Sequence, residues 1–288
     1  MKGHFFVLVF AGLLLASRLN ALALPAAAAA QEGVDVTTTE DGGEDLRIET
    51  RHGPLHLWRP ANYDSHTAGI VIYIHGYFTT IDQTWANDQL AAQFHASGRN
   101  AVFIAIAAPQ SNAEDVSWKS LTDLLETVEE RAPYALPRGP LVVMGHSAAY
   151  RTIVPWLSDS RIQYLILLDA LYAGDAEFRF WLRPRPRAKP HRMVVVAFDT
   201  GPQANRFAHH FYSTSRRKSI PAKASSFTPR ETQARLLYLR SQYDHYEIVN
   251  SGKVIPVLLQ ISPLKAVPAP KPKPATKVAP KPAGGGRG

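Results

Sequence analysis

The chain has 288 residues, of which 45% are hydrophobic, 10% aromatic and 19% charged, and this composition excludes a disordered protein. It contains 0 Cys, which excludes disulfide frameworks, thiolate metal sites and cysteine nucleophiles. The formal net charge of +8 comes from the two ends, because the residues between 31 and 264 carry as many acidic as basic side chains. The basic balance therefore does not indicate a folded body that binds nucleic acid specifically.

Residues 1–30 have the pattern of a secretory signal peptide. A basic start at Lys2 is followed by an apolar run over residues 5–16 and by a stretch of small residues, as export signals require. We expect cleavage after Ala30, with the position after Ala23 as the alternative. Because Arg18 ends the apolar run short of the about 20 residues that span a bilayer, we predict an exported protein, periplasmic or extracellular, without a transmembrane segment after cleavage.

The composition also changes near both ends of the remaining chain. Residues 264–288 consist almost entirely of Pro, Lys, Ala and Gly, which cannot bury enough apolar surface to fold. We expect a disordered tail there, whose charges can contact an anionic surface weakly. Residues 31–45 are rich in Thr, Gly, Glu and Asp and predict a mobile leader. A single folded domain is left over residues 46–263.

Within that domain, short β-branched runs alternate with longer amphipathic segments, a pattern typical of a mostly parallel sheet flanked by helices. We expect strands over residues 55–58, 69–74, 101–106, 140–144, 162–168, 193–198 and 234–239. The helices expected between them cover residues 84–97, 115–131, 150–157 and 205–215. This order predicts an α/β fold with a doubly wound, mostly parallel sheet.

The segment Gly145-His146-Ser147-Ala148-Ala149 lies where an expected strand meets the helix after it. A nucleophile elbow of the pattern G-x-S-x-G occupies this place in some α/β enzymes, because small neighbours allow the serine a strained backbone. Ala149 replaces the last glycine, and a methyl group can still fit there. The alternative is an ordinary turn in which Ser147 caps the helix.

A second loop could complete a site at the same edge of the sheet. His75-Gly76 follows the expected strand at 69–74. Beyond such a glycine, a backbone N–H can point at a developing oxyanion. The candidate donors are the N–H of Tyr77, or that of Phe78, together with the N–H of Ala148.

The general base is expected downstream of Ser147, because the chain order in elbow architectures is Ser, acid, His. His191 precedes a strand at the wrong end of the sheet, and His209 and His210 belong to an amphipathic helix. His245 follows the last expected strand by a short loop. We therefore predict His245 as the base.

Two carboxylates at strand ends are candidates for the acid that orients the base. Asp199 ends the expected strand at 193–198, and Asp169 ends the strand at 162–168. We prefer Asp199 and keep Asp169 as the alternative. Asp244 is discounted, because a side chain adjacent to His245 in sequence tends to point away from it.

These motifs together resemble those of the α/β-hydrolase superfamily, over about residues 54–262. The resemblance implies an α/β-hydrolase fold in one domain, with Ser147 as nucleophile, His245 as base and Asp199 or Asp169 as acid. The elbow with the following Tyr150-Arg151, and the segment Leu167-Leu-Asp-Ala-Leu-Tyr172, are also similar to those of a group of exported bacterial hydrolases of unknown substrate. Phosphate-binding loops, zinc-binding helices and dinucleotide fingerprints are absent from the sequence, so we expect no metal and no organic cofactor.

Two functions remain open at this point. One is a serine hydrolase that cleaves an ester or amide bond in a small-molecule or cell-envelope substrate through an acyl-enzyme. The other is a non-catalytic envelope-binding protein on a hydrolase scaffold, attached through its basic tail. We favour the enzyme, because a degenerate scaffold would be expected to have lost a member of the Ser, His and acid set.

A basic stretch before residue 193 occupies the place where such enzymes often carry a lid. Its cations are Arg179, Arg183, Arg185, Arg187, Lys189 and Arg192. They could recognise an anionic substrate, although a solvated loop is the simpler interpretation.

Overall fold

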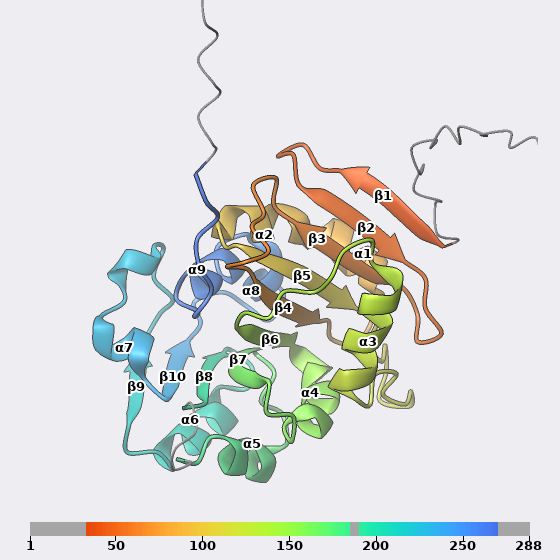
Figure 1. Cartoon of the computed structure of the whole chain (residues 1–288). Helices are drawn as coiled ribbons and strands as arrows, with labels where there is room; N and C mark the ends of the chain where they lie inside the picture. The colour runs from red at the N-terminus through yellow and green to blue at the C-terminus, as the bar shows by residue number, and fades with distance from the viewer. Residues whose placement is uncertain (1–32, 185–189, 270–288) are drawn as a thin grey trace, which may run out of the picture. The chain divides into compact units, whose positions relative to one another are not determined.

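A ten-stranded sheet forms the centre of the described part of the chain, which is residues 33–184 and 190–269 of a computed structural model (Figure 1). The expected signal peptide, residues 270–288 of the expected tail, and Arg185, Arg187 and Lys189 lie outside the described residues. The strands are β1 (Val34–Thr38), β2 (Glu44–Ile48), β3 (Leu55–Arg59), β4 (Gly69–Ile74), β5 (Ala101–Ile106), β6 (Leu141–His146), β7 (Ile162–Leu168), β8 (Arg192–Ala197), β9 (Thr214–Arg217) and β10 (Leu236–Arg240).

Helices connect most of these strands. They are α1 (Ile81–Asn87), α2 (Leu90–Ser97), α3 (Leu121–Arg131), α4 (Tyr150–Trp156), α5 (Asp175–Trp181), α6 (Gly201–His209), α7 (Pro229–Gln233), α8 (Glu247–Asn250) and α9 (Ile255–Gln260), with single 3₁₀ turns η1 (Ser147–Ala149) and η2 (Ala224–Ser226). The single helix expected over residues 84–97 is two helices, because Gln89 adopts a left-handed backbone with φ of 50°.

The strand order β1-β2-β3-β5-β4-β6-β7-β8-β10-β9 is that of a doubly wound sheet, as the sequence predicts. From β5 to β9 all neighbours pair in parallel, and β3 pairs antiparallel with β5. The chain moves from β4 to β5 on one side and then returns to β6 on the other side of β4. Ligands bind at such a switch point, outside the carboxyl ends of the strands, and here those ends lead into His75 and Ser147.

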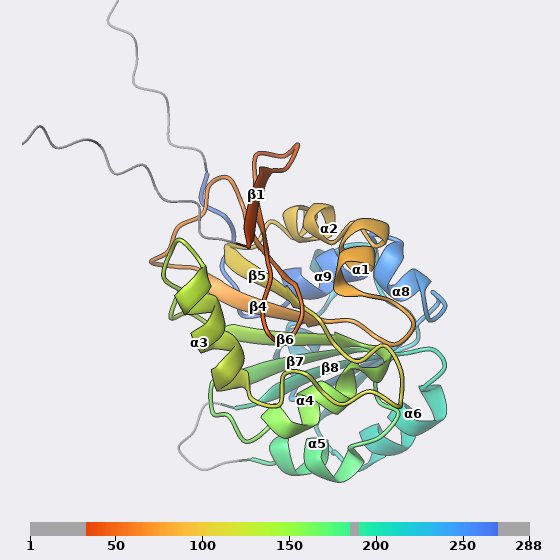
Figure 2. The same ribbon diagram turned by 90° about the vertical axis from the view of Figure 1, so that its right-hand side faces the viewer.

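Helices cover both faces of the sheet (Figure 2), and a layer of buried apolar side chains holds them on each face. Alternate residues of β4 divide between the two layers, since Ile72 and Ile74 face one layer and Val71 and Tyr73 face the other. The helices α3, α4, α5 and α6 contribute to the first layer, and α1, α2, α8 and α9 contribute to the second. Burial on both faces explains why the central strands are continuous apolar runs.

The prediction of a mobile leader over residues 31–45 is wrong for its described part. Val34–Thr38 pairs antiparallel with Glu44–Ile48 and extends the sheet by a hairpin. The polar residues between the two strands form its turn, in which the Asp41 carboxylate accepts the N–H of Gly43 at 3.0 Å. Gly43 is needed because a Cβ atom there would lie 2.5 Å from the indole nitrogen of Trp58.

The predicted domain end at residue 263 is also too early. Leu264 is buried, and the backbone N–H of Asn100 donates to the carbonyl of Lys265 at 2.8 Å. A further bond runs from the N–H of Val267 to the carbonyl of Gly98 at 2.9 Å. The composition of this segment is that of a tail, but one leucine and these backbone bonds fasten it to the loop before β5.

Among the described residues, none of the helices combines the length and the apolar character that crossing a bilayer demands.

Replacing Leu264 by Ala is expected to lower the free energy of unfolding by about 2–5 kcal/mol, because it leaves a cavity against Gly69. Urea unfolding measures the change. Val36→Ala, on the exposed face of β1, is the control and should have little effect. Equal stability of the Leu264 variant and the wild type would mean that this segment is not part of the fold.

Candidate active site

The backbone turns sharply where β6 ends, and this turn presents Ser147. Ser147 has φ of 55°, a left-handed conformation that is costly for a residue with a side chain. Gly145 permits the turn, since a Cβ atom there would lie 2.6 Å from Ile153 and 2.7 Å from the Cβ atom of Ala149. The methyl group of Ala149 therefore fits because residue 145 has none, which accounts for the departure from G-x-S-x-G.

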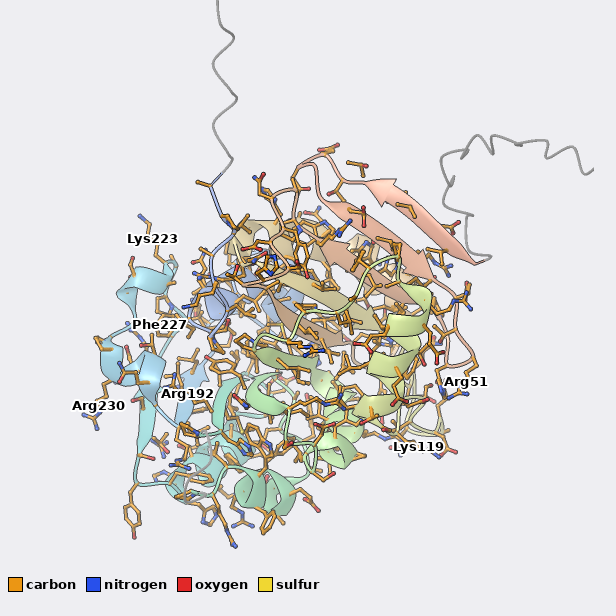
Figure 3. The ribbon with its side chains drawn as sticks, viewed as in Figure 1. Arg51, Lys119, Arg192, Lys223, Phe227 and Arg230 are labelled. Carbon is orange, nitrogen blue, oxygen red and sulfur yellow. The ribbon has the colours of Figure 1, made fainter. Side chains whose placement is uncertain are left out.

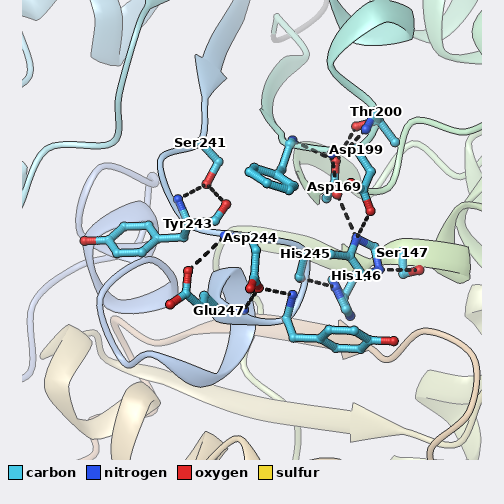
Figure 4. Close-up of polar contacts among 12 residues, drawn as sticks. His146, Ser147, Asp169, Asp199, Thr200, Ser241, Tyr243, Asp244, His245 and Glu247 are labelled. Atoms are coloured by element: carbon cyan, nitrogen blue, oxygen red, sulfur yellow. Dashed lines mark hydrogen bonds and ion pairs between the residues drawn. The ribbon is translucent and has the colours of Figure 1, made fainter.

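His245 lies between Ser147 and a carboxylate (Figure 4). Its Nδ1 donates to Oδ2 of Asp169 at 2.7 Å, and its Nε2 lies 3.0 Å from Oγ of Ser147. A carboxylate only accepts, so the ring proton is on Nδ1 and Nε2 accepts from the hydroxyl. The loop from Ser241 to His245 brings the imidazole back to the sheet, beginning with the N–H of Ser241, which donates to the carbonyl of Ala197 at 2.8 Å.

The carboxylate partner is Asp169, and the preference for Asp199 is not supported by the geometry. The nearest oxygen of Asp199 is 3.8 Å from Nδ1 of His245, and its side chain is 55% exposed. Asp169 is fully buried and has φ of 47°. Its side chain contacts the backbone of the residues that follow β8. Asp199 contributes its backbone instead, with an N–H that donates to Oδ2 of Asp169 at 3.1 Å.

Asp169 is held by a set of donors at the start of α6. Its Oδ1 accepts from the N–H of Phe198 at 2.9 Å and from the N–H and hydroxyl of Thr200 at 2.9 and 2.6 Å. Burial alone would raise the pKa of Asp169, but the hydrogen bonds from His245, Thr200 and Phe198 outweigh burial and lower that pKa well below its usual range. Asp169 is therefore ionised and fixed in place near neutral pH.

His146 is a structural neighbour of the imidazole. Its Nε2 donates to the backbone carbonyl of His245 at 2.9 Å, and the two rings lie 4.6 Å apart. Burial lowers the pKa of His146 to about 3. A neutral His146 thus ties the loop that carries His245 to the end of β6.

His75 and Gly76 shape the loop opposite Ser147. His75 donates from Nδ1 to the carbonyl of Gly76 at 2.6 Å and accepts at Nε2 from the N–H of Ala108 at 3.0 Å. Burial lowers its pKa, and both ring nitrogens are engaged in hydrogen bonds to the backbone. A Cβ atom on Gly76 would lie 2.6 Å from Cβ of Ser147, so only a glycine allows this loop so close to the serine.

Of the two expected donors in this loop, the N–H of Phe78 is occupied, since it donates to the carbonyl of Gln110 at 2.9 Å. Tyr77 is held by Arg151, whose Nη1 donates to the phenol oxygen at 2.6 Å and to the carbonyl of Ser111 at 3.0 Å. The sequence analysis assigned no role in the site to Arg151 or Thr200. Their partners are far away in sequence, because Arg151 contacts Tyr77 and Thr200 contacts Asp169.

Exposed aromatic side chains surround this edge. Phe78, Tyr172, Phe198 and Tyr246 are all exposed. The rings of Tyr172 and Tyr246 lie 6.3 and 5.3 Å from the ring of His245. Each of the four aromatic residues closely follows or precedes a residue of the site in sequence. They offer an apolar border to whatever approaches Ser147.

The described cations of the basic stretch expected as a lid do not gather at this edge. Arg192 is the first residue of β8 and Arg235 directly precedes β10, so both lie at the amino ends of parallel strands. Arg179, Arg183 and Arg235 line a cavity of about 620 Å³ there. His191 is also at this end, as expected, and it packs 4.2 Å from the buried ring of Trp181.

Only one group of three carboxylate and histidine side chains among the described residues could hold a metal ion, namely Asp169, Asp199 and His245, whose ligand atoms lie within 4.8 Å of one another. Their present bonding does not suit a cation. Asp169 accepts from several donors and His245 carries its proton on the nitrogen that faces the carboxylates. These three side chains therefore suit a hydrogen bond in which Asp169 orients the imidazole of His245 better than they suit a metal site.

Comparison with known proteins gives structural likenesses only. No family model and no curated protein sequence matches the chain. The S-formylglutathione hydrolase of Agrobacterium tumefaciens is 10% identical with a TM-score of 0.49, covering 79% of this chain and 97% of that one. The S-formylglutathione hydrolase of Staphylococcus aureus gives the same identity and TM-score over 81% and 99%. A hyperthermophilic esterase of Pyrobaculum calidifontis is 14% identical with a TM-score of 0.44, over 76% and 82%.

The strand order, the parallel register and the strained serine turn decide the architecture. The chain has the α/β-hydrolase fold. Sequence identities this low say nothing about the substrate, so the reaction must be inferred from the geometry of the site itself.

The buried His146 predicts a pH dependence of stability. An unfolded histidine titrates near 6.5 and folded His146 near 3, so the unfolded state binds more protons between these values and stability falls as the pH falls below about 6.5. The contribution is at most about 1.4 kcal/mol per pH unit. We expect His146→Gln, whose amide can still donate to His245, to lose less free energy of unfolding between pH 7 and pH 4.5 than the wild type.

Urea unfolding at the two pH values measures this difference, with the exposed His66→Gln as control. An equal loss in the wild type and the His146 variant would show that His146 is not buried in its neutral form.

Proposed function

We propose that the protein is a serine hydrolase that cleaves an ester or amide bond through an acyl-enzyme. One observation carries the proposal: the imidazole of His245 lies 3.0 Å from Oγ of Ser147 and 2.7 Å from Oδ2 of Asp169, with its proton on the side of the acid. This is the arrangement in which a histidine can take a proton from a serine and remain oriented while it carries the charge.

In the first half of the reaction Oγ of Ser147 attacks the carbonyl carbon, and Nε2 of His245 takes the hydroxyl proton. The imidazolium formed is stabilised by the ionised Asp169. The bond from the carbonyl carbon to the leaving oxygen or nitrogen then breaks, and the leaving group receives the proton from Nε2. In the second half water attacks the acyl-enzyme with His245 again as base, which releases the acid and restores Ser147.

The oxyanion of each tetrahedral intermediate requires donors on the other side of the serine. We assign the N–H groups of Tyr77 and Ala148 to this role. The assignment is supported by the close approach of Gly76 to Ser147 and by the engagement of the N–H of Phe78 with Gln110. Arg151 positions the loop through the phenol oxygen of Tyr77.

We further propose that the enzyme works outside the cytoplasm as a mature chain without residues 1–30. The support is the basic start, the apolar run and the small residues that follow it. A substrate in the cell envelope or its surroundings agrees with this location.

The two candidate acids provide the test of the mechanism. Asp169→Asn is expected to lower kcat for p-nitrophenyl butyrate by about 10⁴-fold, because the histidine loses its orienting carboxylate. Asp199→Asn should keep kcat within about tenfold of the wild type, since its side chain lies beyond hydrogen-bond distance of His245. Ser147→Ala sets the baseline, and unchanged thermal unfolding of each variant excludes misfolding. The reverse order of the two effects would assign the acid to Asp199 and contradict the proposed geometry.

A further inference from the structure

A basic groove lies beside the proposed active site, at the carboxyl ends of the last strands. It is a cavity of about 830 Å³ between the start of α6 and the ends of β8, β9 and β10. Its wall includes Phe198, Asn205, Arg216, Lys218, Tyr238 and Arg240. The mechanism of bond cleavage uses none of these side chains.

The cations of this groove are available to a ligand. Arg240 and Lys218 are exposed, and within the described chain no acidic side chain pairs with either of them. Arg216 donates to the neutral Oδ1 of Asn205 at 2.9 Å and lies 5.8 Å from the ring centre of Tyr238, so its charge is not neutralised either. The fourth cation of the wall, Arg217, is paired with Glu231 at 3.1 Å.

The positive charge is a local feature. Residues 200–230 contain six basic residues and no acidic one, whereas the chain between residues 31 and 264 has equal numbers of both. Charges of one sign gathered in a concave surface raise the local concentration of the opposite ion.

The groove adjoins the catalytic residues at Phe198. Phe198 lines the groove, and its N–H donates to Asp169 at 2.9 Å. Ser147 follows β6, and β8 and β10 are the second and third strands from it. With neighbouring strands about 4.8 Å apart, the groove begins about 10–14 Å from the serine.

The surface between the two sites suits an apolar spacer. The ring of Phe198 is 46% exposed there, and Tyr246 is exposed beside His245. The carboxylate of Asp199 is also exposed in this region and repels an anion held close to the reacting carbonyl. An anionic group is therefore favoured in the groove and disfavoured near the serine.

We propose that the groove binds an oxyanion group, a carboxylate or phosphate, at the far end of an extended substrate whose ester or amide bond lies at Ser147. The proposal rests on the proposed function and adds the class of substrate. Arg240 and Lys218 supply the charge, with Arg216 beside them, and the aromatic side chains contact the spacer.

The test is a series of half-esters of p-nitrophenol with butanedioic, hexanedioic, octanedioic and decanedioic acid, each compared with its neutral methyl ester. Acetate esters of ω-hydroxy acids of matching lengths place the anion on the alcohol side instead. In one of the two series we expect the ratio of kcat/KM for acid over methyl ester to rise by about two- to fivefold from the shortest to the longest chain at low salt. The rise should disappear at 0.5 M NaCl because salt screens exposed charges.

Variants identify the groove as the cause. The double variant Arg240→Gln, Lys218→Gln should lose the rise with chain length and keep its rates on the methyl esters. Arg230→Gln is the matched control, because this cation projects outward from α7 (Figure 3) and is not part of the groove. Substrates of the same lengths that end in phosphate instead of carboxylate show which of the two oxyanions the groove prefers. A constant ratio at every length in both series, or a rise that persists in the double variant, would overturn the proposal.

A binding measurement separates this proposal from the proposed function. Decanedioate binding to Ser147→Ala, measured by calorimetry, should weaken about two- to fivefold when Arg240 and Lys218 are replaced. If this weakening occurs but no ester is hydrolysed in a Ser147-dependent manner, the groove stands and the hydrolase is refuted. Equal binding with and without the two cations refutes the groove whatever the activity.

Discussion

The hydrogen bond between Nδ1 of His245 and Asp169 is the interaction on which the proposed chemistry depends. It fixes the tautomer of the imidazole, and only that tautomer leaves Nε2 free to accept from Ser147. The bond holds because Asp169 is buried in its ionised form, which the donors of Phe198 and Thr200 stabilise. Burying an ionised carboxylate without hydrogen-bond donors would cost free energy, whereas Asp169 accepts hydrogen bonds from His245 on one side and from Phe198 and Thr200 on the other.

The sheet supplies the geometry for that bond. Parallel strands end at one edge, so residues far apart in sequence follow β4, β6, β7, β8 and β10 into the same region. Positive φ angles at Ser147 and Asp169 turn both side chains toward His245. At Ser147 the strained turn is sterically possible because Gly145 and Gly76 leave room that a Cβ atom would fill. Rigid strands in register thus hold a loop-borne base within hydrogen-bond distance of two neighbours.

The sequence predicts the features that depend on local pattern. The buried strands are apolar runs, the elbow is a run of small residues around Ser147, and His245 follows from chain order. What it could not predict depends on contacts across the sheet. Asp199 and Asp169 both end strands, and only the backbone turn at Asp169 makes it the partner of His245. In the same way, residues 31–45 include an edge strand although their composition is polar. The segment around Leu264 is held by backbone hydrogen bonds, which composition cannot predict.

The most direct test of the central claim is labelling of the folded mature protein with a fluorophosphonate, followed by peptide mass spectrometry. The account predicts one adduct, on Oγ of Ser147, formed with loss of fluoride. The adduct should be absent in His245→Ala and retained in His209→Ala, since His209 is exposed on α6. Labelling of Ser147 at an equal rate in both variants, or no labelling of the native wild type, would contradict an activated serine at this site.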